Sequence, residues 1–168
     1  MGAHERSPGA GAEPSGTCVF CERVRTVESF RDLVVFESGE FLVSHQIGDD
    51  GTQAFGVLHV QTKRHVPSLG HLGARESEQL GELLTATCRA LETATGAPWT
   101  YCFGFTEGPR HVHLVLGARY AELPEAYLRL RFADWPDAPR GDRTAVAALC
   151  KSLREALGSS STAPGPTS

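Results

Sequence analysis

Hydrophobic residues change their spacing several times along the chain, and each spacing predicts a different kind of element. Short apolar runs bounded by turn-forming residues are typical of strands, and they cover residues 33–36, 41–43, 54–60, 100–105 and 112–116. A turn containing Gly39 separates the first two runs, and a turn at residues 107–109 separates the last two. The pattern therefore predicts strands that pair through tight turns.

A longer segment, from Ala74 to about Thr95, has apolar residues at every third or fourth position, as one face of a helix requires. Gly96 and Pro98 follow this segment and predict its end. A terminal helix is predicted over residues 144–157, and a further short strand over residues 127–132. Strands before and after one central helix predict an α+β fold with a mostly antiparallel sheet.

Both ends of the chain differ in composition from the part between them. Residues 1–16 and 158–168 are rich in glycine, alanine, proline and serine, which bury too little surface to order themselves. We therefore expect two disordered tails around one domain at residues 17–157. That length is sufficient to bury a core without disulfides.

Charge and hydropathy exclude several classes of protein. A net charge of −4 argues against a nucleic-acid polymer as the partner, because binding to the phosphate backbone depends on clustered lysine and arginine. No apolar run approaches the roughly 18–20 residues of a membrane span. The first residues lack the basic start and apolar stretch of a signal peptide. A cytoplasmic, reducing location follows, so the five cysteines are expected to be thiols or metal ligands.

A Cys-x-x-Cys pair, Cys18 and Cys21, opens the predicted domain. This spacing places two thiolates within about 4 Å of one metal ion, as a tetrahedral zinc site requires. A redox pair is the alternative, but it is expected to open a helix after a strand, and this pair follows a tail. Two ordinary free thiols are the third possibility. A zinc site needs two more ligands, for which histidine is the natural candidate.

Histidine is present at seven positions, of which four lie in or beside predicted strands. His59 is expected to be a core or edge residue with its hydrogen bonds satisfied. His65 directly follows a strand, where a loop could direct it at a metal. His111 and His113 are separated by one residue in an extended segment, so both point to one face and can be two ligands, or one ligand and one catalytic group. Of the other three, His4 lies in the predicted N-terminal tail, and His45 and His71 lie in turn-like surroundings with no partner nearby in the sequence.

In order and spacing, four motifs resemble the histidine-triad superfamily over residues 17–119. The pair Cys18-Val-Phe-Cys21 is similar to the zinc pair of many bacterial members. Residues 56–65, Gly-Val-Leu-His-Val-Gln-Thr-Lys-Arg-His, resemble the family segment Gly-His-x-Leu-Val-x-Pro-Lys-x-His. Residues 108–115 resemble the signature His-φ-His-φ-His-φ-φ, in which φ is apolar, and Arg119 stands where an arginine often follows that strand.

The resemblance implies a five-stranded, mostly antiparallel sheet with a central helix and a C-terminal helix. It also implies a closed, structural zinc site whose ligands are Cys18, Cys21, His65 and His111. With His111 on zinc, His113 becomes the middle histidine of the signature, which is the family's nucleophile. The implied function is a nucleotide hydrolase or nucleotidyl transferase that acts on an α-phosphate through a covalent nucleotidyl-His113.

The partners that the resemblance implies are a small nucleotide-like substrate and a second copy of the chain in a homodimer. Phosphate charge has to be carried by nearby donors and cations. Arg110, Arg119 and Thr106 are the candidates for substrate binding.

Several positions depart from the family pattern, mostly at expected substrate contacts. The third histidine of the signature is Val115, which forms no hydrogen bond, and the family's phosphate-binding run is replaced by a segment with the acidic Glu107. Val57 stands where the family has histidine, and Thr62 where it has proline. Two other functions therefore stay open: a different small-molecule biosynthetic reaction at His113, and a non-catalytic, zinc-stabilised binding domain.

A rival alignment of the signature also stays open. It places Pro109, His111 and His113 at the three positions, with His111 attacking the substrate. This alignment leaves the zinc site short of a ligand.

Overall fold

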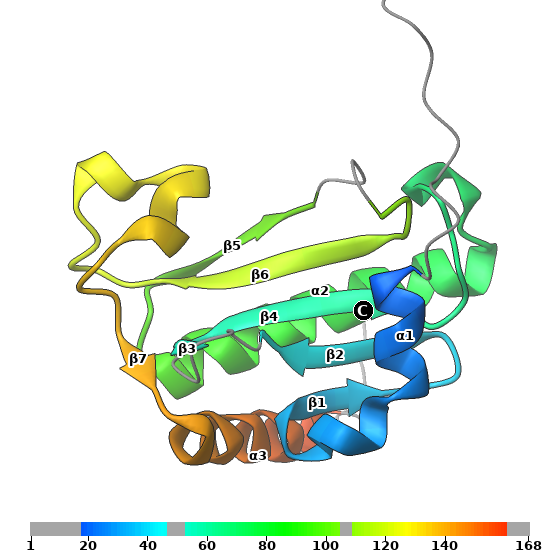
Figure 1. Ribbon diagram of the computed structural model, residues 1–168, viewed down its shortest axis with the longest axis horizontal. Coiled ribbons are helices and arrows are strands. Elements are labelled where there is room, and N and C mark those ends of the chain that lie inside the picture. The colour runs from blue at the N-terminus through cyan, green and yellow to red at the C-terminus, as the bar shows by residue number, and fades with distance from the viewer. Residues whose placement is uncertain (1–17, 47–52, 105–108, 161–168) are drawn as a thin grey trace, which may run out of the picture.

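A five-stranded antiparallel sheet forms the centre of the protein, as the computed structural model shows for residues 18–46, 53–104 and 109–160 (Figure 1). Its strands, in spatial order, are β1 (Val34–Glu37), β2 (Phe41–His45), β4 (Val57–Thr62), β6 (His113–Arg119) and β5 (Trp99–Phe103). A small second sheet pairs β3 (Gln53–Ala54) with β7 (Arg140–Gly141). The predicted α+β class with an antiparallel five-stranded sheet is confirmed.

Three α-helices accompany the sheet within the described residues: α1 (Val19–Arg25), α2 (Ala74–Thr95) and α3 (Arg143–Ser160). The central helix α2 has the bounds that its apolar spacing predicts. It begins where the Gly73 amide donates to Glu76 Oε2 at 2.7 Å. It ends at Gly96, whose φ of 70° lies in the left-handed region that glycine adopts without strain.

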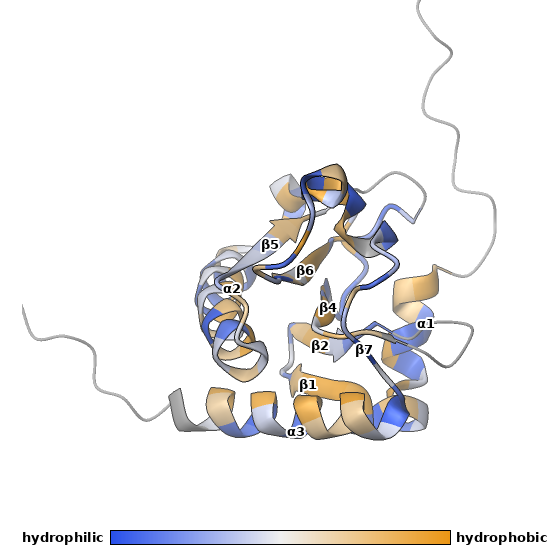
Figure 2. Cartoon of the chain, turned by 90° about the vertical axis from the view of Figure 1, so that its left-hand side faces the viewer, coloured by the Kyte–Doolittle hydropathy of each residue, from blue (hydrophilic) through white to orange (hydrophobic). Residues whose placement is uncertain are grey.

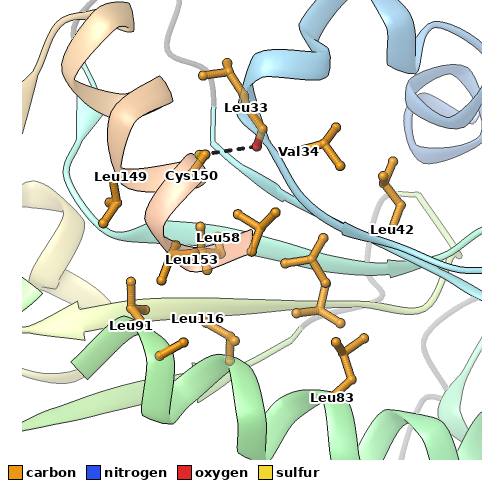
Figure 3. Close-up of a cluster of buried hydrophobic side chains, with 14 of the residues drawn as sticks. Leu33, Val34, Leu42, Leu58, Leu83, Leu91, Leu116, Leu149, Cys150 and Leu153 are labelled. Atoms are coloured by element: carbon orange, nitrogen blue, oxygen red, sulfur yellow. Dashed lines mark hydrogen bonds between the residues drawn. The ribbon is translucent and has the colours of Figure 1, made fainter. Parts of the chain in front are cut away.

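The helices α1 and α2 lie on opposite sides of the sheet, and α3 runs beside β1 (Figure 2). Between α2, α3 and the sheet lies the main core, in which Leu58, Leu91, Leu116 and Leu153 are fully buried (Figure 3). In this core the Cys150 thiol donates to the Leu33 carbonyl oxygen at 3.4 Å. The main core thus occupies one face of the sheet, and α1 packs on part of the other face.

The strand predicted over residues 127–132 is wrong. This segment forms parts of two 3-10 helices, η3 (Glu125–Tyr127) and η4 (Arg129–Asp134). Its apolar side chains pack onto the sheet instead of pairing their backbone with it. Phe132 lies so close to Gly117 that a Cβ at this glycine would come within 2.5 Å of the ring. Together with Trp135, Phe132 covers one end of the sheet face that α1 covers at the other.

Several expectations concern residues outside the described ranges. The predicted disordered tails, 1–16 and 158–168, lie there apart from the end of α3, which runs to Ser160, past the predicted boundary at Leu157. Thr106 and the acidic residue Glu107 also lie outside them. Within the described residues, no helix is both long enough and apolar enough to span a membrane.

Strand register brings candidate residues together on the face toward α1. His59 of β4 pairs with Val115 of β6 on one side and with Ser44 of β2 on the other. Gln61 pairs with His113 in the next row. Because directly opposite residues in antiparallel strands point to the same face, these five side chains share one surface.

Candidate metal centre and active site

Two cysteines and two histidines meet at the start of α1. Their ligand atoms, from Cys18, Cys21, His65 and His111, all lie within 4.8 Å of one another. Cys18 Sγ and Cys21 Sγ lie 3.4 and 3.5 Å from His111 Nδ1, and Cys21 Sγ lies 3.4 Å from His65 Nδ1. The cluster therefore joins the helix α1 to the segments that follow β4 and precede β6.

The geometry of the cluster fits a tetrahedral metal ion. Zinc–sulfur bonds of about 2.3 Å and zinc–nitrogen bonds of about 2.0–2.1 Å give a sulfur-to-nitrogen edge of about 3.6 Å in a tetrahedron. The three distances are close to this edge. Two thiols with two imidazoles are also a donor set that zinc prefers. These four residues could therefore hold a metal ion.

A hydrogen bond at the far side of His111 prepares its ring for this role. The buried His111 Nε2 lies 2.8 Å from the Thr62 carbonyl oxygen, which can only accept, so Nε2 carries the ring hydrogen. The lone pair of Nδ1 then faces the two sulfurs. The Thr62 hydroxyl, 3.1 Å from the same nitrogen, supports this orientation. Thr62 is one of the residues whose part in the site the sequence did not reveal.

The ring of His113 is oriented by its neighbour in the chain. Its Nδ1 lies 2.9 Å from the carbonyl oxygen of His111, so Nδ1 carries the hydrogen and Nε2 keeps a lone pair. Phe20 of α1 stacks on the imidazole with ring centroids 4.1 Å apart. The Phe20 carbonyl also accepts from Gln61 Nε2 at 2.9 Å, which fixes α1 over β4. His113 remains partly exposed.

The candidate substrate-binding residues are not all near His113. Arg110 is exposed and precedes His111 directly. Arg119 lies at the opposite end of β6, about 20 Å along the strand, where its guanidinium sits over the Trp99 ring at 4.6 Å. Thr106 lies outside the described residues.

Two histidines on the central strands differ in how their nitrogens are satisfied. His45, expected in a turn, is the fully buried last residue of β2 and uses both nitrogens, Nδ1 with the Gln46 carbonyl and Nε2 with the Gly56 amide. His59 was expected to be satisfied in the same way, but its buried Nδ1 has no hydrogen-bond partner in the described part of the chain. The pKa of His59 is lowered to about 4, chiefly by burial and further by the charge of Arg23.

Replacing His59 by leucine should make folding less sensitive to acid. The unfolded chain takes up a proton at this position near pH 6.5, whereas the folded chain resists protonation until about pH 4. Between these values the unfolded state binds more protons, so the free energy of unfolding of the wild type falls as the pH is lowered. From about pH 7.5 to about pH 4.5 the wild type should lose roughly 2 to 3 kcal/mol more than His59→Leu.

Urea unfolding at both pH values measures this difference. Acid also affects the cysteine and histidine cluster, but this effect is the same in the wild type and in His59→Leu and cancels in the difference between their free energies of unfolding. His71→Leu, at an exposed position, is the control and should behave like the wild type. Equal losses in His59→Leu and the wild type would contradict the prediction.

The fold of the chain is similar to that of several solved structures, although its sequence is not similar to any family model or curated protein. A hypothetical histidine triad nucleotide-binding protein from Sulfolobus tokodaii has a TM-score of 0.60 at 14% sequence identity, over 84% of this chain and 93% of its own. A zinc-bound histidine triad family protein from Mycobacterium smegmatis has a TM-score of 0.60 at 21% identity, over 88% of this chain and 98% of its own.

The protein has the histidine-triad fold. A uridylyltransferase shares this fold at 18% identity and a TM-score of 0.56. The match covers 86% of this chain but only 46% of the uridylyltransferase. The presence of zinc in the Mycobacterium smegmatis protein agrees with the donor set found here.

Three further residues at this site of the histidine-triad fold escaped the sequence analysis: Phe20, Arg23 and Gln61. Their place depends on where α1 lies against β4, which no local pattern encodes. One signal was present, because His59 and Gln61 are two residues apart on a strand and so must share a face. The hydrogen-bonding role of Thr62 had no such signal.

Proposed function

We propose that the protein transfers or hydrolyses nucleotides, with His113 as the nucleophile toward the α-phosphorus of a nucleoside phosphate. The observation that carries this proposal is the hydrogen bond from His113 Nδ1 to the His111 carbonyl oxygen at 2.9 Å. It favours the tautomer whose Nε2 has a free lone pair, as attack on phosphorus requires. The histidine-triad fold supports the same chemistry.

In the first step, the Nε2 lone pair forms a bond to the α-phosphorus, and the bond from phosphorus to the leaving group breaks. The leaving group departs with that electron pair and takes a proton from solvent. The ring is then cationic, and its Nδ1–H stays on the His111 carbonyl, which stabilises the charge. In the second step, water or another acceptor attacks phosphorus, its proton passes to solvent, and the P–N bond breaks to restore neutral His113.

We propose zinc as the ion of the cysteine and histidine cluster, with a structural role. When bound, zinc fastens α1 to the strands that flank it. Cys18, Cys21, His65 and His111 would supply all four ligands of a tetrahedral ion, as in a structural rather than a catalytic zinc site. The contribution of the chain is to hold α1, and with it Phe20, against the catalytic face.

Trapping of a covalent intermediate tests the proposal. The zinc-loaded protein, mixed with adenosine 5′-phosphoramidate and quenched without acid, should gain the mass of one adenylyl group on the peptide that contains His113. An adduct on the His111 ring would support the rival alignment of the signature. Nucleotide binding without any adduct would indicate a binding domain, and the absence of both would indicate another reaction.

We further propose a homodimer in the cytoplasm as the working form. The resemblance of the sequence to histidine-triad proteins supports the dimer. The thiols of the cluster, which bind metal only when reduced, support a reducing compartment.

A further inference from the structure

Several buried polar atoms lie without partners beneath α1. Within the described residues, Arg23 Nε, His59 Nδ1 and Gln61 Oε1 are buried and form no hydrogen bond. His59 and Gln61 belong to the sheet surface on which His113 lies, and Arg23 of α1 contacts Ser44 on the same surface. A buried polar atom without a partner costs about 1–3 kcal/mol, so a protein rarely gathers three such atoms unless something else satisfies them.

The charge of Arg23 is also uncompensated. Some arginines of the described chain pair with carboxylates, for example Arg25 with Glu22, Arg64 with Glu76 and Arg143 with Asp32. Arg23 has no carboxylate within ion-pair distance among the described residues. Its guanidinium instead donates to Ser44 Oγ at 2.7 Å and lies over the Phe30 ring at 4.9 Å. A half-buried cation of this kind attracts an anion.

Strand register places this cation on one side of His59 and the proposed nucleophile on the other. Ser44, which holds Arg23, is the cross-strand neighbour of His59. On its other side His59 neighbours Val115, and its ring centroid lies 6.4 Å from that of His113 in an edge-on arrangement. His59, Val115 and His113 are each partly exposed, whereas the nitrogen atoms His59 Nδ1 and Arg23 Nε are themselves buried, so phosphate has to displace the side chains that cover them.

The two orphan nitrogens can both act as donors. Arg23 Nε always carries a hydrogen, and neutral His59 presents one at Nδ1 in one of its two tautomers. Two donors and a positive charge that lie around His59, the neighbour of the imidazole nucleophile, match a tetrahedral oxyanion. The neighbouring Val115, at the third position of the signature, offers no such contact.

We propose that Arg23 and His59 bind the phosphate group of the substrate beside His113, so that His59 supplies from β4 the polar contact that Val115 does not supply from β6. This inference rests on the proposed function of His113. In this proposal the phosphate is bound by residues of α1 and β4, and not by Arg119, which lies at the far end of β6.

Direct binding measurements test the site independently of turnover. The zinc-loaded wild type should bind adenosine monophosphate and inorganic phosphate in calorimetry. Arg23→Met and His59→Leu should each weaken both affinities about ten- to a hundredfold, as expected for a lost hydrogen bond to a charged group. The affinity for adenosine, which lacks the phosphate, should not change. Arg75→Met and His71→Leu alter exposed residues of the same types and should bind as the wild type does.

Unchanged phosphate affinity in both variants would overturn the proposal and indicate that water satisfies the orphan atoms. Should either variant fail to fold, the ring and guanidinium nitrogen resonances of wild-type His59 and Arg23 give a second measurement. They should shift on titration with inorganic phosphate, and an absence of shifts would also overturn the proposal. Phosphate binding without a nucleotidyl-His113 adduct would instead contradict the proposed function and leave the phosphate site standing.

Discussion

Cys21→Ser should prevent binding of the zinc ion proposed for the cysteine and histidine cluster, and it should destabilise the protein. Cys21 Sγ contacts both His65 Nδ1 and His111 Nδ1, so its loss breaks the link between two separate segments of chain. The helix α1 spans only Val19–Arg25, which is too short to be stable alone in water. We expect the loss of about one zinc per chain, and of about 3 kcal/mol or more in the free energy of unfolding.

Metal analysis and thermal unfolding measure the two effects together. The melting temperature should fall by roughly 10 °C, and addition of a chelator to the wild type should reproduce the shift. Cys102→Ser is the matched control, because Cys102 is exposed on β5 and belongs to no metal cluster of the described residues. Retention of zinc at full occupancy in Cys21→Ser would show that this thiol is not a ligand.

His113→Ala should abolish turnover of a nucleoside phosphoramidate and leave the metal in place. If the imidazole forms the covalent bond to phosphorus, no other group can substitute for it, and the rate should fall by at least about a thousandfold. Zinc content should stay at the wild-type level because His113 is not part of the cluster. Some stability should be lost, since Phe20 stacks on the deleted ring.

His71→Ala, at an exposed position in the 3-10 helix η2 (Leu69–His71), controls for the loss of an imidazole elsewhere. It should retain full turnover. Turnover that survives in His113→Ala would remove the nucleophilic role from this residue. The rival alignment would then require that His111→Ala lose turnover, together with the metal.

Much of the fold follows from periodicity. The spacing of Leu80, Leu83 and Leu91 predicts α2 with the observed bounds, because one face of a helix must be apolar to pack on a sheet. Residues 127–132 show the limit of the same argument. Their apolar side chains are buried by packing onto Gly117 and its neighbours. A short apolar run in the sequence does not distinguish a segment that packs onto a sheet in this way from one that pairs with it as a strand.

The site was predictable only where residue types are rare and their spacing is constrained. A Cys-x-x-Cys pair has few uses, and the resemblance supplied the two histidines that the structure brings beside it. The contacts of Arg23 and His59 could not be predicted, because they depend on the position of α1, which is set by a cluster of residues up to 93 positions apart. Leucine in place of His59 would fit the strand pattern equally well.

The two bonding groups of His111 serve two different centres. Its ring nitrogen faces the sulfurs, while its backbone oxygen holds the hydrogen of His113, two residues along. A displacement of the whole His111 residue would therefore alter both the cysteine and histidine cluster and the hydrogen bond that orients His113, the proposed nucleophile. Metal ions in enzymes are usually divided into structural and catalytic ions, according to whether they contact the substrate. In this arrangement an ion that never contacts the substrate would still influence whether Nε2 of His113, the proposed nucleophile, keeps its free lone pair.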